Sequence, residues 1–240
     1  MRSRLHPLIA ALIVAPLLGA CNASPEPSWF PLNTGARWEY QVDTDIDGTT
    51  RHDTQSVQVI GNRPLNGRTV YTRRAEMSDN VGIEYLLQVS DSAITRIAQR
   101  TDLQDLPVAD ETPRTVLKLP LRVGATWLAP TVAYTVLRKA EFPRELKYAR
   151  TLQMTYTVEA MDEEVEVPAG RFKQCARIGG RADLTVYADP VNGFRKIPLT
   201  TTEWYCKDVG LVKLVRIENL ESSFFSGGKI EMRLTDFKVR

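Results

Sequence analysis

Residues that could carry out catalysis are scarce in this chain. It has two histidines, His6 and His52, and His6 lies at the start of an apolar N-terminal segment. Nucleophilic catalysis by a Ser/His/Asp or Cys/His arrangement would therefore have to use His52. That histidine stands in a polar stretch, residues 50–54, with no nucleophile motif beside it, which favours an exposed residue over a catalyst. We expect no catalytic residues and no enzymatic activity.

Two groups of carboxylates could bind a cation or move protons. Residues 43–48 imitate the first half of a calcium loop, but Thr54 stands where a bidentate glutamate is needed, so a hairpin tip is the better interpretation. Residues 162–164 and Glu166 are expected to form a solvated turn and strand face rather than an acid/base pair. No glycine pair is followed by the Lys-Ser/Thr of a phosphate-binding loop. We predict neither a metal site nor a cofactor.

The N-terminus has the three parts of an export signal. Arg2 and Arg4 are basic, residues 8–18 form an apolar run of 11 residues broken only by a proline, and residues 18–21 read Leu-Gly-Ala-Cys. A membrane-spanning helix needs about 20 apolar residues, so this run is too short to remain as one. The pattern resembles the signal of bacterial lipoproteins. An ordinary secretory signal with Cys21 near its cleavage point is the alternative.

The lipoprotein resemblance implies a location and an anchor. Residues 1–20 would be the signal peptide, and Cys21 would be the lipidation site. Acyl chains such as palmitate would hold that residue stably in a bilayer. Asn22 is not the aspartate linked to inner-membrane retention, so the expected location is the outer membrane, facing the periplasm. Residues 21–28, with two prolines and two serines, would form a flexible tether.

The other cysteines are Cys175 and Cys206. An even pair in an oxidising compartment predicts one disulfide, worth about 3.5 kcal/mol in the chain-entropy model. Both cysteines lie in strand-like segments, so a bridge between neighbouring strands is expected. Two buried free thiols or a metal pair are the alternatives, although no histidine lies nearby to complete a zinc site.

The charge balance argues against nucleic acid as a partner. The chain has 31 basic and 29 acidic residues, and removal of the signal takes away Arg2 and Arg4. The mature chain is therefore formally neutral and has no bulk attraction for nucleic acid or anionic lipid. Residues 29–240 are long enough for one large β domain or two small ones, and we predict a single β-rich domain.

Alternation of apolar and polar residues predicts β-strands along most of the chain. Trp38, Tyr40 and Val42 show the pattern clearly, and residues 141–150 are the best helix candidate. We predict an all-β fold of antiparallel meander strands, forming a curved sheet or a two-lobed half-barrel with few short helices. Turns that supply positive φ for tight hairpins are expected at Asp47-Gly48, Asn66-Gly67, Asn192-Gly193 and Gly227-Gly228.

Two segments of the chain are alike. Residues 31–38 read Pro-Leu-Asn-Thr-Gly-Ala-Arg-Trp and residues 120–127 read Pro-Leu-Arg-Val-Gly-Ala-Thr-Trp. Weaker echoes follow in the same order, which predicts an ancient duplication with halves at about 30–100 and 119–217. Each half would be a meander of about five strands. Chance recurrence of a turn before an aromatic strand is the alternative.

Three structural motifs carry a second resemblance. They are the Pro-Leu-x-x-Gly-x-x-Trp start, Val-Pro-Ala-Gly-Arg-Phe at residues 167–172, and Trp204-Tyr205 before Gly-Leu-Val-Lys at 210–213. Together they resemble a broad group of uncharacterised bacterial exported β-rich proteins. The folds of that group are similar to the curved sheets of periplasmic lipoprotein carriers. The resemblance spans roughly residues 30–217; it implies an architecture and a binding role, and no catalytic residues carry over.

These observations favour a non-enzymatic binding module for a hydrophobic ligand or an extended peptide. The alternative is a structural or assembly lipoprotein that docks on an envelope protein complex. A hydrolase would need a site built on His52 or on convergent carboxylates, which the spacing does not reveal. The expected partners are the lipid bilayer, through acylated Cys21, and a hydrophobic ligand or an envelope protein, with no nucleic acid.

Overall fold

The computed structural model of the chain describes residues 28–78, 80–138, 151–218 and 225–239. Every regular element within these ranges is a β-strand, so the all-β prediction is confirmed. The predicted signal peptide, Cys21, most of the tether and the predicted helix at 141–150 lie outside the described residues. Within the described part, no helix is long and apolar enough to cross a membrane.

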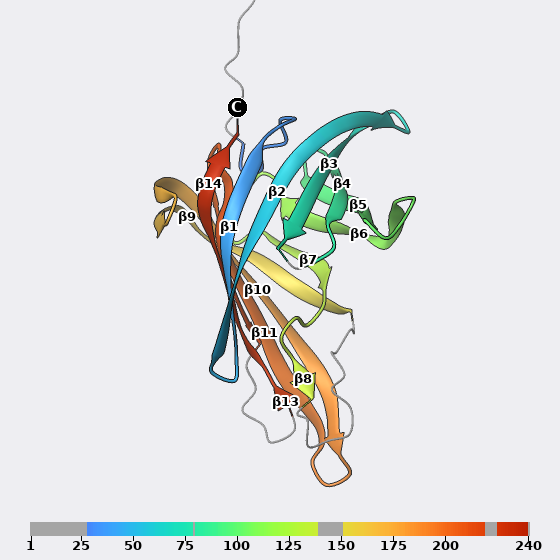
Figure 1. Ribbon diagram of the computed structural model, residues 1–240, viewed down its shortest axis with the longest axis vertical. Coiled ribbons are helices and arrows are strands. Elements are labelled where there is room, and N and C mark those ends of the chain that lie inside the picture. Colours follow the sequence, from blue (N-terminus) through green and yellow to red (C-terminus); the bar gives the residue numbers. More distant parts are fainter. Residues whose placement is uncertain (1–27, 79, 139–150, 219–224, 240) are drawn as a thin grey trace, which may run out of the picture.

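Twelve strands form one antiparallel sheet, in the order β6-β5-β4-β3-β2-β1-β14-β12-β11-β10-β9-β7 (Figure 1). Two short strands, β8 and β13, pair separately. Both halves of the sequence therefore belong to one sheet rather than to two lobes. The strands are β1 (Arg37–Ile46), β2 (Thr49–Leu65), β3 (Arg68–Met77), β4 (Ile83–Val89), β5 (Ala93–Thr101), β6 (Val108–Lys118), β7 (Thr126–Thr131), β8 (Leu137–Arg138), β9 (Leu152–Val167), β10 (Gly170–Asp189), β11 (Gly193–Cys206), β12 (Gly210–Glu218), β13 (Phe225–Ser226) and β14 (Gly228–Lys238).

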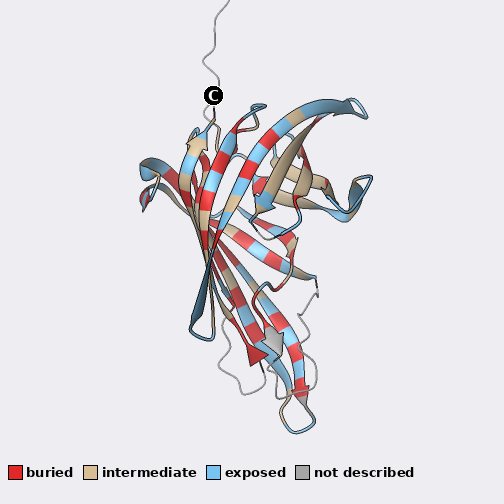
Figure 2. Ribbon diagram, in the orientation of Figure 1, coloured by how far each residue is buried: buried red, intermediate tan, exposed pale blue. Residues whose placement is uncertain are grey.

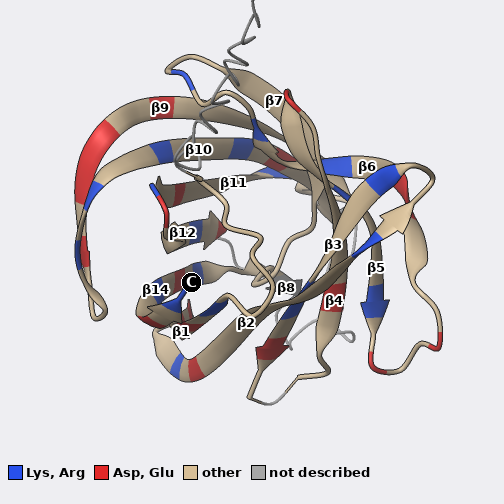
Figure 3. Cartoon of the chain, turned by 90° about the horizontal axis from the view of Figure 1, so that it is seen from above, with Lys and Arg blue, Asp and Glu red and all other residues tan. Residues whose placement is uncertain are grey.

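The sheet curls until its two edge strands, β6 and β7, approach each other, which makes a nearly closed barrel (Figure 3). Side chains bridge the remaining seam. Lys118 Nζ on β6 donates a hydrogen bond to the carbonyl oxygen of Thr126 on β7 at 2.9 Å. Arg114 Nη2 on β6 lies 3.4 Å from the hydroxyl oxygen of Tyr156 on β9. No backbone ladder joins β6 to β7, so these two strands remain the edges of the sheet.

The large sheet contains two successive runs of six strands. Strands β1 to β6 form the first run, and β7, β9, β10, β11, β12 and β14 form the second. The turns that begin the runs are built alike: the N–H groups of Gly35 and Gly124 donate to the carbonyl oxygens of Val59 and Val158, both at 2.8 Å. Each predicted half contributes five strands to the large sheet, as expected, and β6 and β14 lie beyond the predicted bounds of the halves. The duplication itself stays a prediction.

Alternation along the strands places apolar side chains inside the barrel, as Figure 2 shows by alternating buried and exposed segments. Trp38, Tyr40 and Val42 are all buried, as predicted. Full burial of one such side chain contributes roughly 1.5–3 kcal/mol. The polar atoms of these aromatics are also satisfied: Trp38 Nε1 donates to the carbonyl of Val209 at 2.7 Å, and the Tyr40 hydroxyl donates to that of Leu211 at 2.9 Å.

The predicted disulfide between Cys175 and Cys206 is present, and it joins directly paired positions of β10 and β11. The hairpin turns at Asp47-Gly48 and Asn66-Gly67 also form as expected, with positive φ at both residues of each turn. The two turns follow from local chemistry, because a two-residue turn of this type requires a left-handed backbone conformation, which asparagine, aspartate and glycine adopt most readily.

Two local predictions were wrong. Gly227-Gly228 is not a hairpin turn: Gly228 begins β14 and pairs with Ile46, where the adjacent backbone leaves no room for a Cβ atom. Residues 162–164 do not form a turn either. They lie inside β9, at an irregularity where Asp162 has a φ of 60°. Cations on β10 face this acidic stretch, and Arg177 pairs with Glu163 at 2.8 Å, so the strand continues through it.

Candidate functional site

The side chains of the core do not fill the barrel completely. A cavity of about 230 Å³ remains inside, enough for about eight water-sized volumes at roughly 30 Å³ each. Most of its wall is aromatic or aliphatic, as in typical small-molecule sites. The apolar and aromatic lining residues are Phe30, Tyr40, Val57, Ala75, Tyr85, Leu87, Val116, Tyr205, Leu211 and Met232, and the others are Gln55, Arg73, Arg96 and Arg114.

The arginines reach the cavity because they occupy inward positions of their strands. On β3, Arg73 lies two residues after Tyr71 and two before Ala75, and both neighbours pack against the core. On β6, Arg114 lies two residues before Val116, which also lines the cavity. Because successive side chains of a strand point to opposite faces, an arginine two residues from an inward-facing apolar residue also points inside.

The three arginines differ in their partners. Arg96 forms two hydrogen bonds with the Asp110 carboxylate, at 2.8 and 3.0 Å. Among the described residues, no carboxylate lies within 4.0 Å of the guanidinium nitrogens of Arg73 or Arg114. Arg73 instead lies against two rings, with its guanidinium carbon 4.5 Å from the centre of Phe30 and 4.8 Å from that of Trp38. Its buried Nε atom has no hydrogen-bond partner.

The interior also contains buried acidic groups. Burial raises the pKa of Tyr40 to about 12 and the pKa of Tyr205 well above its ordinary value, because a phenolate would lose its contact with water. These phenols remain protonated at neutral pH and do not balance the arginines. Burial also raises the pKa of Glu203, whose Oε2 accepts a hydrogen bond from the Tyr205 hydroxyl at 2.9 Å. The lining of the cavity itself contains three arginines and no carboxylate.

Phe30 separates the interior cavity from an outer groove, and its side chain lines both. The groove has a volume of about 670 Å³ and lies between the chain segment before β1 and the connections that flank β4, β5 and β6. Two hydrogen bonds hold the segment in place, from the Ser28 N–H to Asp208 Oδ1 at 3.0 Å and from the Asp208 N–H to the Ser28 carbonyl at 2.8 Å. The segment follows directly on the predicted tether.

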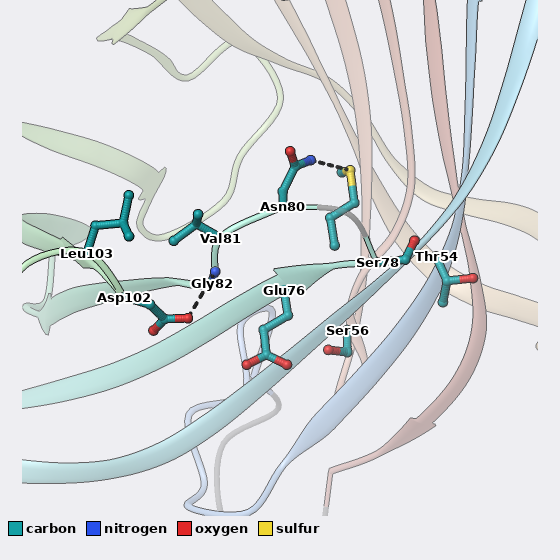
Figure 4. Close-up of a pocket in the computed structure, with 10 residues that line it drawn as sticks. Thr54, Ser56, Glu76, Ser78, Asn80, Val81, Gly82, Asp102 and Leu103 are labelled. Atoms are coloured by element: carbon teal, nitrogen blue, oxygen red, sulfur yellow. Dashed lines mark hydrogen bonds between the residues drawn. The ribbon is translucent and has the colours of Figure 1, made fainter.

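A separate open pocket of about 530 Å³ lies outside the barrel at the β3–β4 connection (Figure 4). Its two carboxylates, Glu76 and Asp102, both pair with Arg74, at 2.5 and 2.7 Å. Asp102 also accepts a hydrogen bond from the Gly82 N–H at 3.2 Å. The hydrogen bonds from Arg74 hold the pKa of Asp102 below its ordinary value. These carboxylates form a surface ion-pair network, which suits them poorly for proton transfer.

The residues that the sequence offered for chemistry lie away from the cavity. His52 is exposed on β2, as predicted, with its Nδ1 atom 2.7 Å from Asp43 Oδ1. That hydrogen bond, with a further contribution from Arg233, lowers the pKa of Asp43. Residues 43–48 form the tip of the β1–β2 hairpin, also as predicted. In the part of the chain described, no three His, Cys, Asp or Glu side chains gather as a set that could hold a metal ion.

Sequence reasoning identified Tyr40 as inward-facing but missed the cavity arginines. The sequence did contain an indication, because Arg73 and Arg114 each lie two positions from apolar residues in segments where apolar and polar residues alternate. An inward-facing arginine is rare enough in a β core to mark a candidate site.

No protein-family model and no curated protein matches the sequence of this chain. Two solved structures are similar in their general β architecture. A protein of Bacteroides fragilis, provisionally assigned as exported and with a YmcC-like fold, is 14% identical over 87% of this chain and 98% of its own, with a TM-score of 0.44. A provisionally assigned lipoprotein of Parabacteroides distasonis is 13% identical over 88% and 99%, with a TM-score of 0.45. Similarity at this level transfers no function.

Proposed function

We propose that this chain is a bacterial envelope lipoprotein that binds an apolar ligand inside its barrel and does not catalyse a reaction. The observation that carries the proposal is the interior cavity, which a chain of this size could have filled with side chains. Protein cores normally pack to crystal-like density, so a partly open space with a mainly aromatic and aliphatic wall favours a ligand.

The surroundings of Phe30 support a route into the cavity. The outer groove and the cavity share this one side chain, which packs 6.3 Å from the Tyr205 ring, centre to centre. A rotation of Phe30 would join the two spaces into a site large enough for a longer apolar chain. Because Phe30 lies close after the tether, the membrane anchor and the mouth of the barrel would sit near each other.

The proposed anchor is acylated Cys21, and the proposed location is the periplasmic face of the outer membrane. Both rest on the N-terminal signal and on Asn22. An apolar ligand fits such a place, because lipids and acyl chains need a protected apolar space to leave a bilayer. The bilayer itself would be the first partner of the protein.

Native mass spectrometry tests the proposal. The mature chain carrying Cys21→Ser, purified gently from periplasm, is expected to retain a small apolar molecule or to bind added lipid. Val116→Trp, which fills the cavity wall, should reduce that binding, whereas Leu128→Trp on the exposed face of β7 should not. A clean unliganded mass that stays unchanged on titration with lipid would contradict the proposed function.

The β10–β11 hairpin favours a second candidate function, docking on an envelope protein. Its tip projects at the lower end of Figure 1, and Tyr187, Val191 and Phe194 are 45%, 93% and 73% exposed. Exposed apolar clusters of this kind often mark interaction sites. Crosslinking in intact envelopes, with Phe194→Ser as the comparison, would support this function if one partner protein is captured by the native chain and lost with the variant.

A further inference from the structure

The charge inside the barrel indicates more about the ligand than the apolar wall does. Of the three cavity arginines, Arg96 already has its counter-charge in Asp110. Among the described residues, neither Arg73 nor Arg114 has a carboxylate within 4.0 Å, and no carboxylate belongs to the lining of the cavity. A guanidinium taken out of water without a paired carboxylate destabilises the fold, because its hydration is lost and weaker contacts replace it only in part.

The neighbours of Arg73 only partly replace water. The rings of Phe30 and Trp38 lie within 5 Å of its guanidinium carbon and stabilise the cation through their faces. They accept no conventional hydrogen bond, and the buried Nε atom of Arg73 has no partner among the described residues, although Tyr40 lies close enough to contribute a side-chain hydrogen bond to the guanidinium. In the same part of the chain, Arg114 Nη2 lies 3.4 Å from the hydroxyl of Tyr156, and the Glu203 carboxyl interacts with Arg114 only over a longer distance than an ion pair. Both arginines are partly accessible although strands surround them, because they face the cavity.

We propose that Arg73 and Arg114 bind the anionic group of an amphipathic ligand, a carboxylate or a phosphate ester on an apolar chain. The inference rests on the proposed function and specifies the ligand's chemistry. The planar arginine fork matches both kinds of anion through paired, charge-assisted hydrogen bonds. The apolar chain would lie along Val57, Leu87 and Met232. The cavity holds about eight water-sized volumes, which fits an anionic group with a short length of chain.

Four probes separate the contributions of charge and chain: octanoate, octyl phosphate, octanol and inorganic phosphate. Binding to the mature Cys21→Ser chain is measured by calorimetry and by the fluorescence of Trp38, which lies beside Arg73. Octanoate or octyl phosphate should bind more tightly than octanol by roughly tenfold or more, because hydrogen bonds to a charged group are the strong ones. Equal binding by octanol and both anions would overturn the inference while leaving the proposed function intact.

Arg73→Met removes the charge and keeps the apolar length of the side chain. It should lower the affinity for octanoate and octyl phosphate several-fold more than the affinity for octanol, with the remaining preference for the anions supplied by Arg114. Arg74→Met is the matched control, because Arg74 is adjacent in sequence but forms its ion pairs outside the cavity. Inorganic phosphate that binds as tightly as octyl phosphate would also overturn the inference, since the chain would then contribute nothing. Failure of all four probes would overturn the proposed function together with the inference.

The stability of the ligand-free variant gives a second readout. A purely structural arginine would be needed for folding, so its loss would lower the melting temperature. An arginine whose partner is a ligand lowers the stability of the ligand-free protein. Arg73→Met should therefore melt at the same temperature as the native chain or at a higher one. A lower melting temperature together with unchanged octanoate binding would assign Arg73 to the fold and overturn the inference. If Arg73→Met does not fold, Arg114→Gln provides the same comparison of probes.

Discussion

At the scale of single residues, the interior of this barrel is unusual for its buried titratable groups. Glu203, on β11, has its side chain inside near the cavity and accepts a hydrogen bond from the Tyr205 hydroxyl. Burial is the largest influence on this carboxyl and raises its pKa above the ordinary 4.5, although the hydrogen bond and the charges of Arg114 and Arg216 act in the opposite direction. The folded protein therefore binds this proton more tightly than the unfolded chain.

Ionisation of the buried Glu203 carboxyl should therefore lower the free energy of unfolding as pH rises, and Glu203→Gln should remove this loss. Because the folded-state pKa is raised, the stability linked to this group is complete below about pH 4.5 and is lost as pH rises through the folded-state pKa. The variant should melt at a higher temperature than the native chain at pH 7.5, and the gap should close near pH 4. Thermal melts across this range test the expectation. A difference in melting temperature that is the same at every pH would contradict this expectation. The control variant Glu166→Gln changes an exposed carboxylate and should melt at the same temperature as the native chain.

At the scale of elements, one buried ion pair holds the connection between β7 and β8 against β12. Glu218 Oε2 accepts hydrogen bonds from the backbone N–H groups of Tyr134 and Thr135, both at 2.7 Å, while Oε1 accepts from Arg216 Nε at 2.8 Å. Arg216 Nη2 in turn donates to the carbonyl oxygen of Val132 at 3.0 Å. Both side chains are almost inaccessible, at 5% for Arg216 and 0% for Glu218. The crossing segment is thus fixed by polar groups that have no access to water.

Glu218→Gln should therefore be among the most destabilising single changes in the chain. It leaves the Arg216 guanidinium buried without its counter-charge, and breaking a buried pair in this way costs about 3–5 kcal/mol. Urea unfolding followed by far-UV circular dichroism measures the loss. Asp236→Asn, which removes an exposed carboxylate opposite Arg37, should cost only about 0–1 kcal/mol. Equal losses from the two substitutions would show that the buried pair does not hold the connection.

At the scale of the whole molecule, the barrel is continuous everywhere except at the seam between β6 and β7. Every other neighbouring pair of strands in the sheet is joined by ladder hydrogen bonds, and the two edge strands meet through side chains such as Lys118. Regions with fewer cooperative hydrogen bonds open more readily. The seam also lies beside the cavity, because Arg114 and Val116 of β6 line it. An extended peptide that adds a strand would have to bind at this edge.

Hydrogen exchange should reveal the seam directly. Amides of β6 are expected to exchange faster than those of β11, which is paired on both sides and is joined to β10 by the disulfide. Mass spectrometry of peptides from the two strands, after exchange for seconds to hours, measures the difference. Octanoate at saturating concentration should slow exchange in β6 if the cavity is occupied. Equal protection of β6 and β11 in the free protein would mean that the barrel is closed as tightly there as elsewhere.

Features that depend on neighbouring residues could be predicted from the amino-acid sequence. Alternation around Trp38 and Tyr40 predicted strands and their buried faces, and Asn66-Gly67 predicted a hairpin turn. These succeed because strand parity and left-handed turn residues act over a few positions. The pairing of Cys175 with Cys206 was also accessible, since an exported chain with one remaining pair has a single way to join it.

The closure of the strands and the space that they surround depend on the folded chain as a whole. The contact of β6 with β7 joins residues brought together by the whole curvature of the sheet, which no local pattern encodes. The cavity is likewise the space left by side chains from nine strands and the segment before β1. Arg73 and Arg74 are chemically identical in the sequence. Strand alternation indicates which of the two points inside, but their contacts, with Phe30 for one and with a surface carboxylate for the other, are properties of the assembled fold.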